Sequence, residues 1–351
     1  MAAKRLLLLL AHAIEEFDQV RLLSELNYDV FSIGSYTNPS VPQDPKRPAL
    51  PQVAYHPELE AACEAKRAGH DGQDSLATPV GPRPPIDWAK ADLPEEIIDW
   101  ADAIICHHFE HTWIAPQWDR IKHKRVIWRT VGQSVEHNER MMSPLRKEGL
   151  QIVRYSPKER NIPGYAGEDA LIRFYKDENE WDGWIGSQQR VLNFTQNLFQ
   201  REPYTNWKFW NEATQDLPAA AEGPGSEVIG GAGQCTLAMM QYLLQSSRAY
   251  LYTGTQPASY TLGLIEAMMV GIPVVSIGPS WMEVFPYGPL LFEGHEIARL
   301  WSNSPTAARN MLAALLKHED YAREVSEAQR TMAVELFGKQ KIAAEWKAFL
   351  G

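Results

Sequence analysis

Residues 249–278 read AYLYTGTQPASYTLGLIEAMMVGIPVVSIG, and this stretch decides the fold. The apolar run 249–252 predicts a buried strand, and the run 262–269 predicts a helix. Gly271 ends that helix, and the apolar run 273–277 then predicts a second buried strand. A strand, a helix and a strand in this order are typical of the βαβ unit of a parallel sheet.

The turn between the first strand and the helix predicts an anion site. Backbone N–H groups at a helix N-terminus bind phosphate, because they lack intrahelical partners and lie at the positive end of the helix dipole. Glu266 follows one turn inside the helix, close enough to accept hydrogen bonds from ribose hydroxyls when a diphosphate sits at the helix tip. The candidate donor-binding residues of this stretch are Thr253, Gly254, Tyr260, Thr261, Leu262 and Glu266.

The stretch resembles the C-terminal domain of retaining GT-B glycosyltransferases of the sucrose-synthase and bacterial mannosyltransferase type. Their pattern is Glu, seven residues, then Glu-Ala-Met, followed by Gly-x-Pro-Val-Val, and residues 266–268 and 271–275 match it. The resemblance implies that Glu266 binds the ribose and that the amides of the turn bind the diphosphate. The family's first Glu, which contacts sugar hydroxyls, falls on Ala258, so that contact is expected to be missing or supplied from elsewhere.

Further donor contacts are expected upstream in the same half of the chain. A predicted strand, 191–195, precedes Asn197 and Arg201, and Arg201 is the expected phosphate cation because a guanidinium can bind two phosphate oxygens at once. Another predicted strand, 227–229, leads into Gly230 and Gly231, which look like the family's turn near the base. The resemblance covers residues 187–335 at the level of motifs and the N-terminal half by architecture.

The first half of the chain repeats the same α/β rhythm. We expect an α/β protein of the GT-B class, with two Rossmann-like domains facing across a cleft. The expected boundaries are 1–178 for the acceptor domain, with a Pro- and Gly-rich insertion at about 36–86, and 187–335 for the nucleotide-sugar domain. The polar segment 176–187 is the predicted linker between them, and a last helix within 336–351 is expected to cross back to the first domain.

Polar residues follow the predicted strands of the N-terminal half. In similar enzymes these loops bind the acceptor, and a histidine there often contacts the donor sugar. His12 and His108 are therefore candidate catalytic residues together with Arg201, and the acceptor-binding candidates are His107, Arg129, Gln133 and Ser134. His107 and His111 have a spacing that could bind a metal on a helix, but the sequence suggests no third ligand, so no metal site is expected.

Composition narrows the classes of function. The formal net charge of −10 disfavours nucleic-acid binding. Three cysteines without CxxC spacing indicate a reducing compartment, so a cytoplasmic protein is expected. No apolar run has the length of a membrane span, and the leucines near the N-terminus fit a buried strand better than a signal peptide.

These observations predict a hexosyl or pentosyl transferase that moves a sugar from a nucleoside-diphosphate sugar, with UDP or GDP, to an unidentified acceptor. By resemblance, the reaction retains configuration and needs no cofactor besides the nucleotide-sugar co-substrate. One alternative is a viral-type glycosyltransferase that acts on modified bases in DNA. The other is a GT-B-shaped nucleotide-sugar-binding protein without catalysis, for which the absent first Glu is the support.

Overall fold

The computed structural model describes residues 3–9, 13–33, 53–67, 92–107, 111–132, 134–281 and 300–351. Its contacts divide the chain into two compact units. Unit 1 comprises Met1–Ile172 and Ala343–Gly351, and unit 2 comprises Arg173–Ile342. Most of the expected insertion at about 36–86 lies outside the described residues.

Unit 1 contains a six-stranded sheet in which neighbouring strands pair in parallel. The chain moves from β1 outward to β2 and then returns to the other side of β1 to continue through β3. The order reverses between β1 and β3, and this is the topological switch point where ligands bind in such sheets. Across the sheet the strands are β2 (Asp29–Ser32), β1 (Arg5–Leu9), β3 (Ala103–His107), β4 (Arg125–Arg129), β5 (Gln151–Arg154) and β6 (Ala170–Leu171).

Helices cover the sheet of unit 1 because its strands are buried on both sides. Since crossovers between parallel strands are right-handed, the reversal of strand order places α1 on one face and α4 and α5 on the other. Leu7, Ile104 and Ile152 lie in the core on the face that α4 and α5 cover. The helical segments are α1 (Ala13–Glu25), α2 (Pro57–Arg67), α3 (Glu95–Trp100), α4 (His111–Ile121), α5 (Glu136–Lys147) and η2 (Pro157–Asn161).

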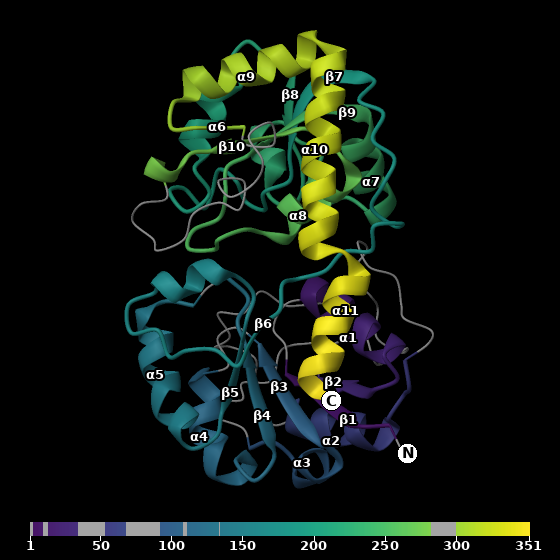
Figure 1. Ribbon diagram of the computed structural model, residues 1–351, viewed down its shortest axis with the longest axis vertical. Coiled ribbons are helices and arrows are strands. Elements are labelled where there is room, and N and C mark those ends of the chain that lie inside the picture. Colours follow the sequence, from purple (N-terminus) through teal and green to yellow (C-terminus); the bar gives the residue numbers. More distant parts are fainter. Residues whose placement is uncertain are drawn as a thin grey trace. The chain divides into compact units, whose positions relative to one another are not determined.

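Unit 2 contains a second parallel sheet (Figure 1). Its residues form a separate hydrophobic core. The strand order is β11 (Trp301–Ser302), β10 (Val274–Ile277), β9 (Ser247–Tyr252), β7 (Gln188–Asn193) and β8 (Ala219–Ala221). Helices α6 and α9 pack together, while α8 contacts α7 and α10. The helical segments are α6 (Trp207–Ala213), η3 (Ser226–Ile229), α7 (Leu237–Ser246), α8 (Leu262–Val270), η4 (Pro279–Trp281), α9 (Pro305–Lys317) and α10 (Glu319–Phe337).

Two local features differ from the sequence-based expectations. The prediction of a strand at 227–229 is wrong, because this segment forms the 3₁₀ helix η3. The strand of this region is β8, which precedes η3 in the chain. Gly225 and Gly230 flank η3 with φ values of 82° and 87°, a left-handed conformation that interrupts an extended run. The expected linker 176–187 packs within unit 2, where Lys176 is 1% exposed.

The last helix, α11 (Lys339–Leu350), begins in unit 2 and ends in unit 1. Arg125 donates hydrogen bonds to the carbonyl oxygens of Phe349 at 2.7 Å and Leu350 at 3.0 Å. A cation at this end of a helix is favourable because the last carbonyls lack intrahelical donors. Trp346 is buried on the same helix, and the Arg129 guanidinium lies 5.7 Å from the centre of its ring.

Within the described residues, no helix has both the length and the apolar character needed to cross a bilayer. All three cysteines lie in this part of the chain, and none of them forms a disulfide bond. Nor does the described part bring together three His, Cys, Asp or Glu side chains in a group that could hold a metal ion.

Candidate functional site

The switch point of unit 2 lies between β7 and β9, which are neighbours in the sheet although their onward connections run in opposite directions. Asn193, the last residue of β7, joins the carboxyl ends of the two strands. Its Nδ2 donates to the carbonyl oxygen of Leu251 at 2.8 Å, and its Oδ1 accepts from the Thr195 N–H at 2.6 Å. The loop after β7 is therefore held against β9.

The hydroxyl group of Tyr250 in β9 connects this loop to α8. It accepts a hydrogen bond from the Phe194 N–H at 3.0 Å, and a Cβ added to Gly263 would lie 3.9 Å from its oxygen. Burial raises the pKa of Tyr250, and the charge of Glu266 raises it further. The loop after β7, the first turn of α8 and the Glu266 carboxylate thus lie around one buried hydroxyl.

The N-terminus of α8 has the geometry of an anion site. Thr261 is the N-cap, and its hydroxyl accepts from the Leu264 N–H at 3.4 Å. Helix geometry leaves the N–H groups of Leu262 and Gly263 without intrahelical acceptors, and residues 261–263 are partly exposed. Tyr260 is 1% exposed and its ring packs against Phe174 and Phe337, so the ring does not face a ligand.

Glu266 lies one turn into α8 and forms a buried ion pair. Its Oε1 is 2.7 Å from Nζ of Lys176, and the two side chains are 4% and 1% exposed. The ammonium group also lies 5.5 Å from the centre of the Trp181 ring. Lys176 lies at the start of the expected polar linker, and no local signal connects two residues 90 positions apart.

The loop after β7 places Asn197 and Arg201 near each other. The Arg201 N–H donates to the Asn197 carbonyl oxygen at 3.0 Å, and Asn197 has a φ of 51°. The Arg201 side chain is partly exposed, and within the described residues it makes no hydrogen bond or ion pair. Its charge is therefore not committed to a protein carboxylate.

The loop after β9 is bonded to the loop after β7. The Asn206 Nδ2 donates to the carbonyl oxygen of Thr253 at 2.8 Å, and the Gln256 N–H donates to the Tyr204 carbonyl oxygen at 2.8 Å. Thr253 is fully buried, and the following Gly254 has a φ of 74°. The structure thus brings Thr253 and Gly254 to the same sheet edge as the phosphate candidates.

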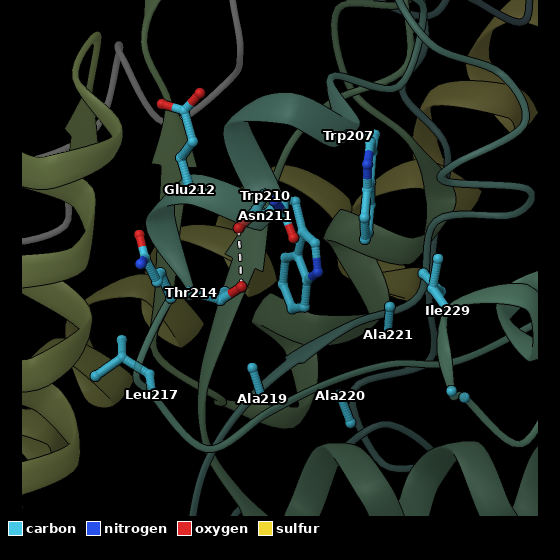
Figure 2. Close-up of a pocket in the computed structure, with 13 residues that line it drawn as sticks. Trp207, Trp210, Asn211, Glu212, Thr214, Leu217, Ala219, Ala220, Ala221 and Ile229 are labelled. Atoms are coloured by element: carbon cyan, nitrogen blue, oxygen red, sulfur yellow. Dashed lines mark hydrogen bonds between the residues drawn. The ribbon is translucent and has the colours of Figure 1, made fainter.

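Gly230 and Gly231 line a pocket of about 570 Å³ between α6 and the edge strand β8 (Figure 2). The Trp207 and Trp210 rings form part of its wall. The other donor candidates do not line this pocket, and its lining carries the Glu212 carboxylate but no cationic side chain. Because a diphosphate requires amides or cations, we centre the candidate site on the carboxyl ends of β7 and β9.

The acceptor candidates of unit 1 are partly described. His107 and Arg129 end neighbouring strands and are register partners, and both side chains are fully buried. The Arg129 Nη1 donates to the carbonyl oxygen of Ile172 at 2.5 Å. Ser134 lies before α5 and is 4% exposed. The remaining candidates His12, His108 and Gln133 lie outside the described residues.

The alternative of a helical metal pair is wrong. His107 ends β3 and His111 begins α4, so the two residues do not share a helix. The i, i+4 spacing brings two side chains to one face only when both residues are helical.

No protein-family model matches the sequence, and no curated protein matches it. Solved structures are similar over nearly the whole length. Sucrose-phosphate synthase from Thermosynechococcus elongatus is 12% identical, with a TM-score of 0.69 over 99% of this chain and 98% of that one. The chain has the GT-B fold.

Two further structures agree with the GT-B fold. Anabaena Alr3699/HepE in complex with UDP-glucose is 12% identical, with a TM-score of 0.65 over 99% of both chains. A glycosyltransferase from Rickettsia africae ESF-5 is 11% identical, with a TM-score of 0.66 over 99% of this chain and 98% of that one. The predicted class, GT-B with two Rossmann-like domains, is thereby confirmed.

Proposed function

We propose that this chain is a glycosyltransferase that uses a nucleoside-diphosphate sugar as donor. The observation that carries the proposal is the grouping at the switch point of unit 2. The loop after β7, the N-terminal turn of α8 and Glu266 all lie around the Tyr250 hydroxyl. UDP is the first nucleotide to test, because Alr3699/HepE, which shares the fold, forms a complex with UDP-glucose.

Each group in this arrangement has a proposed role. The amides of Leu262 and Gly263 and the guanidinium of Arg201 bind the diphosphate and stabilise the charge that develops on it as the sugar departs. Asn197, Thr253 and Gly254 shape the loops around it. These groups supply positive potential without a metal ion, and the reaction is proposed to proceed with retention of configuration.

Glu266 is proposed to accept hydrogen bonds from the ribose hydroxyls. Only 3% of the residue is exposed, so a ribose contact requires neighbouring side chains to move. The partly exposed turn 261–263 lies one helical turn before Glu266. The acceptor is proposed to bind in unit 1 near Ser134.

The proposal is tested by measuring nucleotide release and binding. Purified full-length chain is incubated with UDP-glucose, UDP-GlcNAc or GDP-mannose, and free UDP or GDP is quantified over hours. We expect slow hydrolysis of one donor without acceptor, and stabilisation by the matching nucleotide in a thermal-shift assay, because a ligand bound to the folded state raises the melting temperature. Arg201→Ala is the matched variant and should lower both signals. Absence of binding by every donor and nucleotide would contradict the proposal.

One observation favours a second candidate, a nucleotide-sugar-binding protein that does not transfer. Ala258 stands where the resembling family has its first Glu, and its N–H donates to the Thr255 carbonyl oxygen at 2.8 Å. A methyl group there offers no hydrogen bond to a sugar hydroxyl. Tight binding of a donor without hydrolysis, and without transfer to any acceptor in a glycan panel, would favour this candidate.

A further inference from the structure

The buried ion pair formed by Lys176 and Glu266 is expected to contribute little net stability. Both side chains are almost completely buried, and the two charged atoms are 2.7 Å apart. Removing two charges from water costs about as much as their attraction returns, and apolar residues of similar size often serve stability equally well. Stability alone therefore does not explain why this pair lies beside the candidate donor site, and we infer that it has a further role.

Several contacts fix the backbone and the side chain of Lys176. Its N–H donates to the carbonyl oxygen of Phe337 at 3.1 Å, and it forms an isolated parallel bridge with Gly338. The neighbouring Asp177 pairs with Lys339 at 3.0 Å. The ring of Trp181 lies beside the ammonium group and leaves it little freedom. The cation is thus held by the segments around residues 176 and 338, outside the sheet that carries the donor loops.

The held cation pairs with the carboxylate of Glu266, one turn into α8 from the N-terminal turn that is the proposed diphosphate site. Glu266 influences the Tyr250 hydroxyl, which in turn accepts from the Phe194 N–H in the loop after β7. A buried carboxylate without a nearby cation takes up a proton more readily, and its rotamer is less restricted. A protonated or misdirected carboxyl group is a poorer acceptor for two ribose hydroxyls than an ionised one.

We propose that Lys176 is the positioning residue for recognition of the donor ribose: its ammonium group holds the Glu266 carboxylate in place and directs it toward the hydroxyls. This inference rests on the proposed function, because it requires that a nucleotide bind at the switch point of unit 2. Lys176 itself does not touch the nucleotide. The donor site then depends on the segment that begins unit 2, as well as on the strand and helix motif of residues 249–278.

The test compares ribose and deoxyribose nucleotides by isothermal titration calorimetry. UDP and 2′-deoxy-UDP, and GDP and 2′-deoxy-GDP, are titrated into the full-length chain and into the variants Lys176→Met, Lys176→Arg, Glu266→Gln and the double variant K176M/E266Q. For the unmodified chain we expect the ribose form to bind at least about tenfold more tightly, which is the effect of one hydrogen bond to a charged group.

We expect Lys176→Met to reduce this ratio to about twofold or less, and Lys176→Arg to retain most of it, since arginine keeps the charge. The double variant should have the ratio of Glu266→Gln alone, because the two residues act as one unit. It should also recover melting temperature relative to Lys176→Met, since no unpaired carboxylate remains. This recovery separates positioning from stability and keeps the test valid if Lys176→Met alone does not fold.

The outcomes are distinguishable. A full ribose preference in Lys176→Met or in the double variant overturns the positioning role and leaves the proposed function standing. Equal binding of ribose and deoxyribose forms by the unmodified chain overturns the positioning role as well. Failure of the unmodified chain to bind any of the four nucleotides overturns both the proposed function and this inference.

Discussion

Unit 1 and unit 2 each bury an ionic cluster near the carboxyl end of the sheet, and the two clusters differ in construction. In unit 1, Arg154 ends β5 and donates to both carboxylate oxygens of Glu139 at 2.6 and 2.7 Å, with Glu159 3.8 Å away. In unit 2, the Lys176 ammonium group lies 2.7 Å from Oε1 of Glu266.

The difference indicates two kinds of role. All three side-chain nitrogens of Arg154 donate to acceptors in the protein, the Glu139 carboxylate and the Gly167 carbonyl oxygen. Glu159 accepts from Thr130 at 2.8 Å and caps the start of η2. Such a closed cluster orders the loops of unit 1. The pair in unit 2 lies one turn from the partly exposed start of α8, and its carboxylate is the proposed acceptor for the donor ribose.

The largest effect is expected from breaking the cluster of unit 1. Arg154→Met leaves Glu139 and Glu159 buried without their cation and should lower the free energy of unfolding by about 3–5 kcal/mol. Urea unfolding followed by circular dichroism at pH 7 measures this loss. Arg140→Met is the control, because it removes an exposed pair with Glu136 and should change stability little. A similarly small loss for both variants would remove the distinction between closed and exposed pairs.

The next effect concerns pH. Burial raises the pKa of Glu159 from 4.5 to about 7, although Arg154 and Thr130 act in the opposite direction. The folded state therefore binds this proton more tightly than the unfolded state. The stabilisation is full below pH 4.5 and is lost as the pH rises through 7, by about 3 kcal/mol in all.

Glu159→Gln removes this titration, so the pH dependence of its unfolding should lack that decline. Unfolding midpoints of both proteins in urea, measured from pH 4.5 to 8, check the expectation. Parallel profiles for the two proteins would show that Glu159 is ionised in the folded state throughout the range.

Breaking the pair of unit 2 should weaken ligand binding, which breaking the cluster of unit 1 should leave unchanged. Glu266→Gln is expected to weaken nucleotide affinity by about 1.5–3 kcal/mol, the effect of losing charged hydrogen bonds. Calorimetry with UDP and GDP measures the change. Glu212→Gln is the matched control, because it removes the same charge from an exposed position in α6. Equal affinity in the two variants would mean that Glu266 has only a structural role.

The smallest expected effect concerns the phosphate cation. Arg201→Ala should weaken UDP binding by about 1 kcal/mol and leave uridine binding unchanged, because only the diphosphate interacts with the guanidinium. Lys208→Ala removes an exposed cation from α6 and serves as the charge control. If uridine and UDP lose affinity equally, Arg201 stabilises the loop rather than the phosphate.

Local patterns predicted most of unit 2 correctly. The helix expected at 262–269 is α8 at Leu262–Val270, and the strand expected at 273–277 is β10 at Val274–Ile277. Apolar runs and helix-ending glycines act over a few residues, so a sequence shows them directly. The prediction of a strand at 227–229 is wrong, and the strand of this region is β8 instead. The three alanines of β8 give no strong strand signal, whereas β-branched residues would have given one.

The candidate site was predictable only in part. The turn at 260–262 and Glu266 follow from the pattern around them, and so does their position at a sheet edge. That Glu266 is buried and paired could not be predicted, because its partner lies 90 residues away in a segment that looks like a polar linker. The sequence likewise offers no sign that His107 and Arg129 are fully buried.

The sequence by itself determined the parallel α/β architecture and the helix terminus that forms the candidate anion site, because both depend on periodicity and turn residues within short windows. Only the tertiary structure decided which charges meet, since Arg154 with Glu139 and Lys176 with Glu266 come together through packing of distant segments. The cost of burying a charge depends on its neighbours in space, and folding alone sets those neighbours.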